Sequence, residues 1–500
     1  MGLQIRRVLG FKRIYGVNAM NLNYGSVTNL SFLDRVKLQF LKHIENTAEE
    51  KVISERFTKW FSMGNDFVLD GDKELSKEQI KEIDKFWERY KFAYPKICYN
   101  EFKAYMNRTG IFSPYYIPAG IRTIFIAPYL QHKHYYWSEQ NKTLLNKIFN
   151  NIKQPVAIVR RMNGYFYDGN YNRINLPIAV KLCLEHLSNG KEFIWKPNDV
   201  SGGGRGIRFF KTATEKELSS FFTTGANSFV VQDVMKQHID MEKLNPYAVN
   251  TLRITSIIWK NEVVVLGAVL RTGTSEKRVD NWSAGGLIVG VDKNTGLTLS
   301  WGSDKKNNKS SVTFGGVQLS NGYQIPSWEK VIDTVKRAHH NIPYIKLASW
   351  DIAIDEIGDP TLIEVNFAGD WHLHQLTTGP MLGELTKEIL DKAILENYYK
   401  KHATLNFDYK EFYDHIIVEK YLGNSSKVVI PEMMYGKPVS VIGKRAFRFN
   451  KSVKEVVLPN TIKVIGERAF SGCVSLEKIN VPIKATVHKT AFIDCPVTKK

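Results

Sequence analysis

The chain has 500 residues, which at roughly 100–200 residues per domain corresponds to about two to four domains. Hydrophobic residues make up 43% of the sequence and aromatic residues 12%, which excludes a disordered chain and suffices for sizeable cores. Lysine and arginine total 69 against 50 acidic residues, and the resulting net charge of +19 predicts attraction to anions without specifying their class.

The expected localisation follows from segments that the sequence lacks. No apolar stretch of secretory length follows the basic N-terminus, and no run of about 18 apolar residues occurs, so we expect no signal peptide and no membrane span. No nucleic-acid-binding motif is present. The cysteines are too sparse for a disulfide framework, and we expect buried free thiols in a reducing cytoplasm. They are Cys98, Cys183, Cys473 and Cys495.

Residues 1–95 have the pattern of a helical N-terminal region. In SKEQIKEIDKFWERY, Ser76 stands at a capping position, and Ile80, Ile83 and Phe86 recur at helical spacing. From about 96 to 405, short β-branched strands alternate with turns and helices, including a helix expected from about 139 to 152. This alternation predicts an α+β (α/β) enzyme-like core.

A glycine-rich loop follows an apolar strand in FIWKPNDVSGGGRGIRFFK. Lys196 ends that strand, where its ammonium could neutralise a phosphate, and glycines let backbone N–H groups approach a polyphosphate. A second strand follows, which excludes both a Walker loop and a Rossmann fingerprint. The alternative is a plain glycine-rich hairpin. The candidate phosphate-loop residues are Ser201, Gly202, Gly203, Gly204 and Gly206.

Acidic residues gather in a second motif, SWDIAIDEIGDPTLIEVNFAGD. Asp351 lies on one expected strand, and Glu364 and Asn366 lie on the next, at i and i+2 and therefore on one face. The turn between the strands folds Glu364 back beside Asp351, 13 residues earlier. Two carboxylates and an amide oxygen suit Mg²⁺, although a solvated hairpin face is the alternative.

Residues 415–500 contain an internal repeat. IGKRAF (442–447), IGERAF (465–470) and VHKTAF (487–492) recur at intervals of 23 and 22 residues, with strand-like segments between them. A period of 20–29 residues predicts a leucine-rich-repeat solenoid, in which neighbouring units must stack to bury their apolar faces. The repeats resemble the bacterial surface-antigen type of leucine-rich repeat.

Together, the lysine with its glycine-rich loop and the later D…E-x-N hairpin resemble the ATP-grasp superfamily. The resemblance implies two α+β subdomains that clamp ATP and Mg²⁺, with Asp351, Glu364 and Asn366 on the metal. It also implies that Lys142 (less well Lys147) touches the nucleotide. The strand SFVVQDV matches the segment that meets the adenine, which implies contacts from Gln232 and Val234.

The intervening NTLR, LR-x-G, VDN and GG elements look like the sugar-transfer-associated ATP-grasp family. This implies a ligase for exopolysaccharide or cell-wall polymer synthesis, in which a carboxylate attacks ATP and an amine displaces phosphate from the acyl phosphate. Arg253 and Arg271 are the candidates to hold the carboxylate, unless they form structural ion pairs. The segment from Asp280 and Asn281 to Gly285 and Gly286 resembles a substrate loop.

One departure keeps the reaction open. Peptide-ligase-type relatives commonly carry an arginine two residues before the first metal carboxylate, where this chain has Ser349. A phosphotransferase acting on a sugar is therefore an alternative, and so is a nucleotide-binding scaffold. The expected partners are ATP, a small-molecule or sugar-linked substrate, and a protein bound by the repeats. The expected domains are 1–95, 96–405 and 415–500.

Two histidine pairs are discounted as metal ligands. His372 and His374 alternate on what reads as a strand, as do His132 and His134, but no cysteine or carboxylate stands at a suitable spacing. We expect solvated or hydrogen-bonded histidines.

Overall fold

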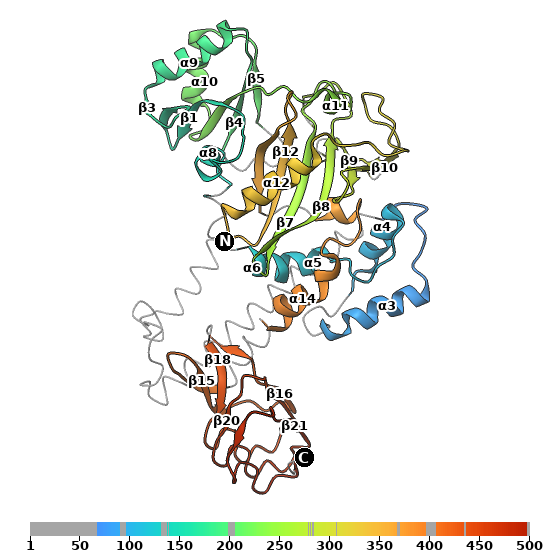
Figure 1. Cartoon of the computed structure of the whole chain (residues 1–500), viewed down its shortest axis with the longest axis vertical. Coiled ribbons are helices and arrows are strands. Elements are labelled where there is room, and N and C mark those ends of the chain that lie inside the picture. The colour runs from blue at the N-terminus through green and yellow to red at the C-terminus, as the bar shows by residue number, and fades with distance from the viewer. Residues whose placement is uncertain are drawn as a thin grey trace. The chain divides into compact units, whose positions relative to one another are not determined.

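A computed structural model of the chain describes residues 68–90, 97–131, 138, 140–198, 206–278, 280, 282, 285–306, 308–367, 371–396, 407–434 and 437–497. These residues fall into two compact units, one ending at Ile394 and one beginning at Leu395 (Figure 1). The described helices before residue 131 belong to the first unit, together with both of its sheets. The domain limits at residues 95, 405 and 415 stay predictions.

The described N-terminal residues are helical. Helix α3 (Lys77–Trp87) begins as expected at Ser76, whose side chain forms a capping box with Gln79. Helix α4 (Tyr99–Thr109) ends at Gly110 in the left-handed conformation. Short helical segments follow: η3 (Glu88–Tyr90), α5 (Ala119–Ile121), η4 (Arg122–Ile126), α6 (Ala127–Leu130) and α8 (Leu145–Ile148).

The helix expected over 139–152 is thus reduced to the single turn of α8. Lys142 lies in the turn before that helix, and Asn151 and Ile152 lie after it.

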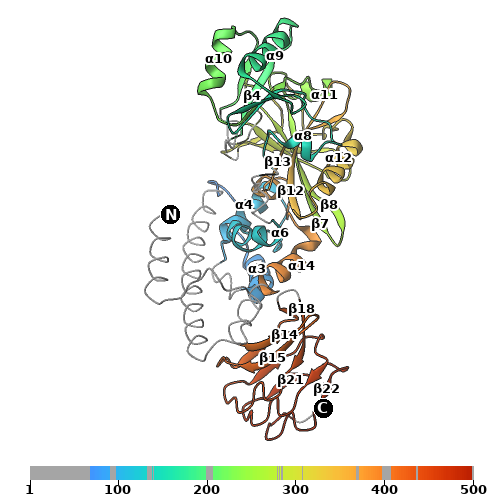
Figure 2. The ribbon, with the colours of Figure 1, turned by 90° about the vertical axis from the view of Figure 1, so that its left-hand side faces the viewer.

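A six-stranded antiparallel sheet and two helices form what we call the small lobe (residues 157–233). The strand order is β3-β2-β1-β6-β4-β5. Helices α9 (Leu176–Ser188) and α10 (Glu215–Thr224) pack together and cover the sheet around a core that includes Phe193 and Phe229 (Figure 2). The strands are β1 (Ala157–Met162), β2 (Tyr165–Asp168), β3 (Arg173–Ile174), β4 (Phe193–Pro197), β5 (Arg208–Phe210) and β6 (Phe229–Asp233).

A seven-stranded antiparallel sheet forms the large lobe (residues 239–366), in the order β11-β10-β9-β8-β7-β12-β13. Its strands are β7 (Thr251–Trp259), β8 (Glu262–Thr272), β9 (Leu287–Val291), β10 (Thr298–Ser303), β11 (Lys309–Ser310), β12 (Leu347–Ile354) and β13 (Pro360–Asn366). Its helices are α11 (Ile239–Glu242) and α12 (Trp328–His340), and the latter packs on the sheet. Trp350 and Ile254 pair across β12 and β7 and share a core with α12. Because side chains alternate along a strand, Asp351 and Arg253 face the opposite side.

After the large lobe the chain forms four short helices: α13 (His372–Gln375), η8 (Gly383–Leu385), α14 (Thr386–Leu390) and η9 (Asp391–Glu396). The strand expected at His372 and His374 is wrong, because both residues lie in α13. Both side chains are buried, and the ring of His374 is hydrogen-bonded through Nε2 to Thr255 Oγ1 at 2.9 Å. These two are therefore hydrogen-bonded, as expected, whereas His132 and His134 lie outside the described residues.

The second unit is a solenoid built from two stacks of parallel strands. One stack contains β15 (Ile416–Tyr421), β18 (Lys437–Ile442), β20 (Val464–Ile465) and β22 (Thr486–Val487), with β14 (Phe407–Glu411) and β17 (Met433–Met434) antiparallel at its margins. The other contains β16 (Lys427–Val429), β19 (Glu455–Val457) and β21 (Lys478–Asn480).

The AF pair of each repeat explains how the units stack. The rings of Phe447, Phe470 and Phe492 form one column, with centroids 4.8 and 5.2 Å apart. Cys473 is buried beside this column and Cys495 is half-buried, and both are free thiols, as are the buried Cys98 and Cys183.

Among the described residues, no helix combines the length and the apolar composition that crossing a bilayer requires.

Candidate nucleotide-binding site

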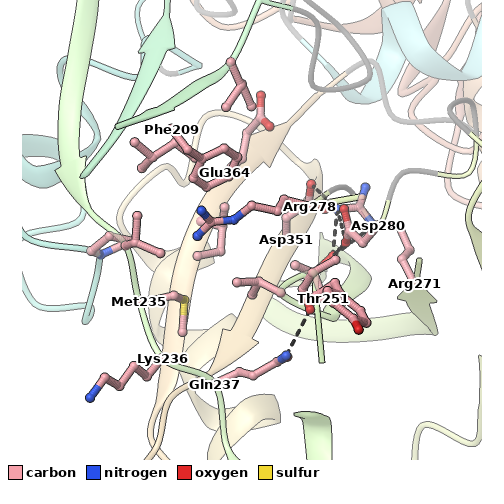
Figure 3. A pocket seen from close by; sticks show the side chains of 18 of the residues that line it. Phe209, Met235, Lys236, Gln237, Thr251, Arg271, Arg278, Asp280, Asp351 and Glu364 are labelled. Atoms are coloured by element: carbon pink, nitrogen blue, oxygen red, sulfur yellow. Dashed lines mark hydrogen bonds and ion pairs between the residues drawn. The ribbon is translucent and has the colours of Figure 1, made fainter. Parts of the chain in front are cut away.

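A pocket of about 830 Å³ lies between the small and large lobes. The small lobe contributes Lys196 and Phe209 to its lining, and the large lobe contributes Asp351, Glu364 and Asn366. Figure 3 shows Phe209, Asp351 and Glu364 around this pocket. The glycine-loop strand and the acidic hairpin, more than 150 residues apart in the sequence, therefore line one cavity.

Two lysines lie close to Glu364 of the acidic hairpin, and one of them, Lys196, lines the pocket. Lys142 Nζ lies 2.9 Å from Glu364 Oε1, and Lys196 is buried close to both side chains. Burial lowers the pKa of Lys196 to about 8, against the opposing effect of Glu364 and with a further lowering by Lys142. The neutral form of Lys196 is thus accessible at moderately alkaline pH, and an added anion would favour the charged form.

The acidic hairpin has the register that the spacing predicts. Asp351 pairs directly with Glu364 across β12 and β13, and Ser349 pairs with Asn366. Glu364 and Asn366 both line the pocket. The side-chain amide nitrogen of Asn366 is buried and has no hydrogen-bond partner within the described part of the chain, so the protein leaves this amide incompletely satisfied.

Asp351 is held by two guanidinium groups. Arg253 reaches it through Nε and Nη2, the latter 2.9 Å from Oδ2, and Arg271 Nη2 lies 3.1 Å from the same oxygen. Burial raises the pKa of Asp351, but the two arginines outweigh it and hold that pKa below its usual value. Burial lowers the pKa of Arg271, and nearby carboxylates, led by Asp280, more than reverse this. In this structure both arginines form ion pairs. Structural ion pairs were the alternative to the prediction that these arginines hold a substrate carboxylate.

The ion pairs still leave donors on both guanidinium groups. Arg253 uses Nε and Nη2 for Asp351, and Arg271 uses Nε and Nη2 for Thr251, Asp280 and Asp351. The Nη1 group of each has no hydrogen bond to the described residues. Since a guanidinium has five N–H donors, an ion pair on one edge does not prevent an anion from binding on another.

The pocket is also lined by apolar side chains. Ile194, Ile207 and Phe209 line it from the small lobe, and Ile363 from the large lobe. The segment after β6 adds Val234, Met235, Lys236 and Gln237 to the lining. Val234 thus lines the pocket, and its contact with the adenine stays a prediction. The buried side chain of Gln232 does not line the pocket, because it turns toward the carbonyl oxygen of Pro155, 3.5 Å away.

Only the last residue of the expected phosphate loop can be placed. Gly206 has φ +81°, and a Cβ added there would lie 3.2 Å from Pro197 Cγ, so this position favours glycine on both counts. Ser201, Gly202, Gly203 and Gly204 lie outside the described residues, and their role as phosphate ligands stays a prediction.

Comparison with known proteins identifies the first unit. The family model for sugar-transfer associated ATP-grasp proteins matches residues 141–391. The chain belongs to the sugar-transfer associated ATP-grasp family. Residues 420–499 match the BspA-type leucine rich repeat region in six copies. The expected architecture, an ATP-grasp fold preceded by helices and followed by leucine-rich repeats, is therefore confirmed.

Similar solved structures include members of both classes. A leucine-rich repeat protein of T. pallidum is 34% identical over 18% of this chain and 43% of its own length, with a TM-score of 0.18. Biotin carboxylase of Campylobacter jejuni is 14% identical over 54% of this chain and 47% of its own (TM-score 0.31). D-alanyl-alanine synthetase A of Vibrio cholerae is 11% identical over 52% of this chain and 64% of its own length, with a TM-score of 0.30. This chain thus spans less than two thirds of each of these proteins. No curated protein matches it.

Two pocket residues of this ATP-grasp protein, Arg278 and Phe209, were missed at the sequence level. Arg278, between β8 and β9, reaches the small lobe, where its guanidinium lies 3.9 Å from the ring centroid of Phe209 and Nη1 lies 2.6 Å from Glu192 Oε2. Figure 3 shows Arg278 and Phe209 side by side in the pocket. Asp280, two residues later, is hydrogen-bonded to Thr251. Arg278 is a basic residue in the segment KRVDN, but only the tertiary structure shows that it contacts Phe209 of β5.

The expected substrate loop is described in part. Asp280 lines the pocket and joins the arginine cluster, and Gly285 has φ +100°. Asn281 lies outside the described residues. The role of this loop stays a prediction.

Proposed function

We propose that this chain is a Mg²⁺- and ATP-dependent ligase that joins a carboxylate to an amine through an acyl phosphate. The observation that carries the proposal is the convergence of Lys142 and Lys196 on Glu364, a residue that lines the pocket, with Arg253 and Arg271 also on the pocket wall. Family membership supports an ATP-grasp enzyme, and the convergence supports the particular chemistry.

ATP would lie in the pocket with its base against the apolar side chains. Ile194, Phe209 and Ile363 offer apolar contact, and the backbone near Val234 offers hydrogen bonds to the base edge. The triphosphate would then reach Lys196 and Lys142, whose ammonium groups neutralise phosphate charge.

The residues present fit a magnesium ion. Glu364 uses Oε1 for Lys142, and no described residue donates a hydrogen bond to Glu364 Oε2 or to Asn366 Oδ1, so both oxygens can accept a cation. Glu364 and Asn366 would hold the ion, and Asp351 would join them while it still contacts the guanidinium groups. Bound Mg²⁺ supplies charge neutralisation for the phosphates.

The chemistry uses positioned charge rather than a side-chain nucleophile. A substrate carboxylate oxygen attacks the γ-phosphorus of ATP. The bond between the γ-phosphorus and the oxygen that bridges it to the β-phosphate breaks, and ADP leaves. The amine then attacks the acyl carbon, phosphate leaves, and the nitrogen releases a proton to solvent. The Nη1 donors of Arg253 and Arg271 orient the carboxylate and stabilise the developing negative charge.

Ser349 does not argue against this reaction. Its hydroxyl is buried 2.8 Å from Thr255 Oγ1, so the position that holds an arginine in peptide-ligase-type relatives contributes no charge here. Arg253 pairs directly with Asp351 across β7 and β12 and supplies a guanidinium from the neighbouring strand. Because Arg253 provides the guanidinium that Ser349 lacks, we favour the ligase reaction over simple phosphoryl transfer.

The biological setting follows from the family description and is part of the proposal. The amine or the carboxylate would be carried by a sugar or an amino acid, in exopolysaccharide or cell-wall polymer synthesis. The enzyme would act in the cytoplasm, and the repeats would bind a protein partner.

The test measures release of ADP and phosphate with candidate amino acids and sugar nucleotides. A ligase gives a hydroxamate when hydroxylamine replaces the amine, whereas a phosphotransferase gives a phosphorylated sugar and no hydroxamate. Glu364→Ala should abolish turnover. Glu388→Ala, which removes a surface ion pair with Lys260, is the matched control and should retain it. ATP binding without any turnover would favour the scaffold.

A further inference from the structure

Asn198 connects the end of strand β4 to the segment that bears Lys142. It follows Lys196 and Pro197 at the end of β4, and its backbone N–H donates to the carbonyl oxygen of Ser228 at 2.9 Å. Its side-chain Oδ1 accepts the backbone N–H of Lys142 at 2.8 Å. Asn198, whose own backbone is fixed by this bond to Ser228, therefore holds the backbone of Lys142, which lies 56 positions earlier in the sequence.

The Lys142 turn depends on such contacts. Because Lys142 precedes α8, its N–H has no place in a helical hydrogen-bond ladder, and Asn198 supplies the acceptor. Its neighbours are anchored separately: Asn141 Oδ1 accepts the N–H of Thr143 at 2.9 Å, and the hydroxyl of Tyr171 donates to the Thr143 carbonyl at 3.0 Å. Within the described residues, Asn198 provides the one hydrogen bond between this turn and the strand of Lys196.

The position of the Lys142 backbone determines where its ammonium lies. Lys142 Nζ reaches Glu364 Oε1 at 2.9 Å, and its side chain is only 16% exposed. A lysine stem is flexible, so a fixed backbone limits the number of positions the ammonium samples. Small displacements of groups that bind a reacting phosphate carry a large cost in rate.

We propose that Asn198 is a positioning residue for nucleotide binding: it fixes the backbone of Lys142 so that the ammonium stays between Glu364 and the phosphates. This rests on the proposed function, because it assumes that the pocket binds the nucleotide phosphates. A merely structural hydrogen bond would affect folding but would have no effect that depends on the Lys142 side chain.

The experiment measures binding of Mg²⁺ with a non-hydrolysable ATP analogue by calorimetry, on the full chain. We expect Asn198→Ala to weaken binding about 5- to 20-fold and Asn198→Asp, which keeps the acceptor, to stay within about threefold of wild type. The matched control is Asn175→Ala. It removes the same kind of bond, from Asn175 Oδ1 to the Ile178 N–H at the start of α9, and should leave binding unchanged.

A double-mutant cycle with Lys142→Met decides the mechanism. If Asn198 acts through the ammonium, adding Asn198→Ala to Lys142→Met should change affinity by less than about twofold. The same loss in both backgrounds, or an unchanged affinity of Asn198→Ala, would overturn the proposal. If Asn198→Ala lowers the unfolding temperature, measuring the cycle below that transition keeps the comparison valid. Failure of the wild-type chain to bind the analogue would instead refute the proposed function.

Discussion

Replacing Asp351 with asparagine tests whether the buried charge cluster carries stability as well as chemistry. Asp351 is 3% exposed and contacts the guanidinium groups of Arg253 and Arg271. Asparagine preserves the shape and removes the charge. Arg271 keeps Asp280 at 3.3 Å, whereas Asp351 is the carboxylate to which Arg253 is paired.

The magnitude follows from the number of partners that remain. Removing one partner of a buried ion pair typically costs about 3–5 kcal/mol. Because Arg271 retains a carboxylate, we expect the lower end, about 3 kcal/mol, which corresponds to a factor of more than about one hundred in the unfolding equilibrium. Asp333→Asn is the control, since Asp333 pairs with Arg337 on the surface and should contribute less than about 1 kcal/mol.

The assay uses the distribution of tryptophan. All ten tryptophans precede Leu395, so denaturant unfolding followed by tryptophan emission reports the first unit without interference from the repeats. Because the pKa of Asp351 is depressed in the folded chain, its stabilisation is present at neutral pH and is lost as pH falls through that pKa. In Asp351→Asn, the free energy of unfolding should therefore fall less steeply as the pH is lowered than it does in the wild type. If Asp351→Asn lowers the free energy of unfolding no more than Asp333→Asn does, the idea that the buried charge cluster stabilises the fold is wrong.

Three further predictions concern the pocket and the repeats. The pKa of Lys196 is lowered to about 8, so affinity for Mg·ADP should fall as pH rises from 7 to 9, and Lys196→Met should remove this dependence in a calorimetric titration. Gly206→Val should lower stability by about 1–3 kcal/mol and weaken nucleotide binding, because φ is +81°; unchanged stability and binding would contradict this. Phe470→Ala should cost about 3–5 kcal/mol in the repeat unit. Far-UV circular dichroism should detect that loss, and an unaltered melting curve would mean that the ring column is dispensable.

Local patterns in the chain were enough to identify several parts of the molecule. Ser76 at its capping position, the 22- and 23-residue repeat, and the two-strand hairpin that places Asp351 beside Glu364 were all predicted and are all present. Each of these depends on residues close together in the sequence, or on a turn between adjacent strands. The expected helix over 139–152 and the expected strand at His372 failed because short segments take their conformation from what packs on them.

The arrangement of charge in the pocket depended on contacts that no spacing encodes. Arg253 meets Asp351, which lies 98 positions later in the sequence. Asn198 meets Lys142, and Arg278 meets Phe209 from the other lobe. These pairings depend on the order of strands in two sheets and on how the two lobes close around the cavity. The amino-acid sequence was therefore sufficient for the kinds of groups in the site and their local spacing. Only the folded chain decided which charges neutralise one another, because burial and strand register bring distant residues within ion-pair distance.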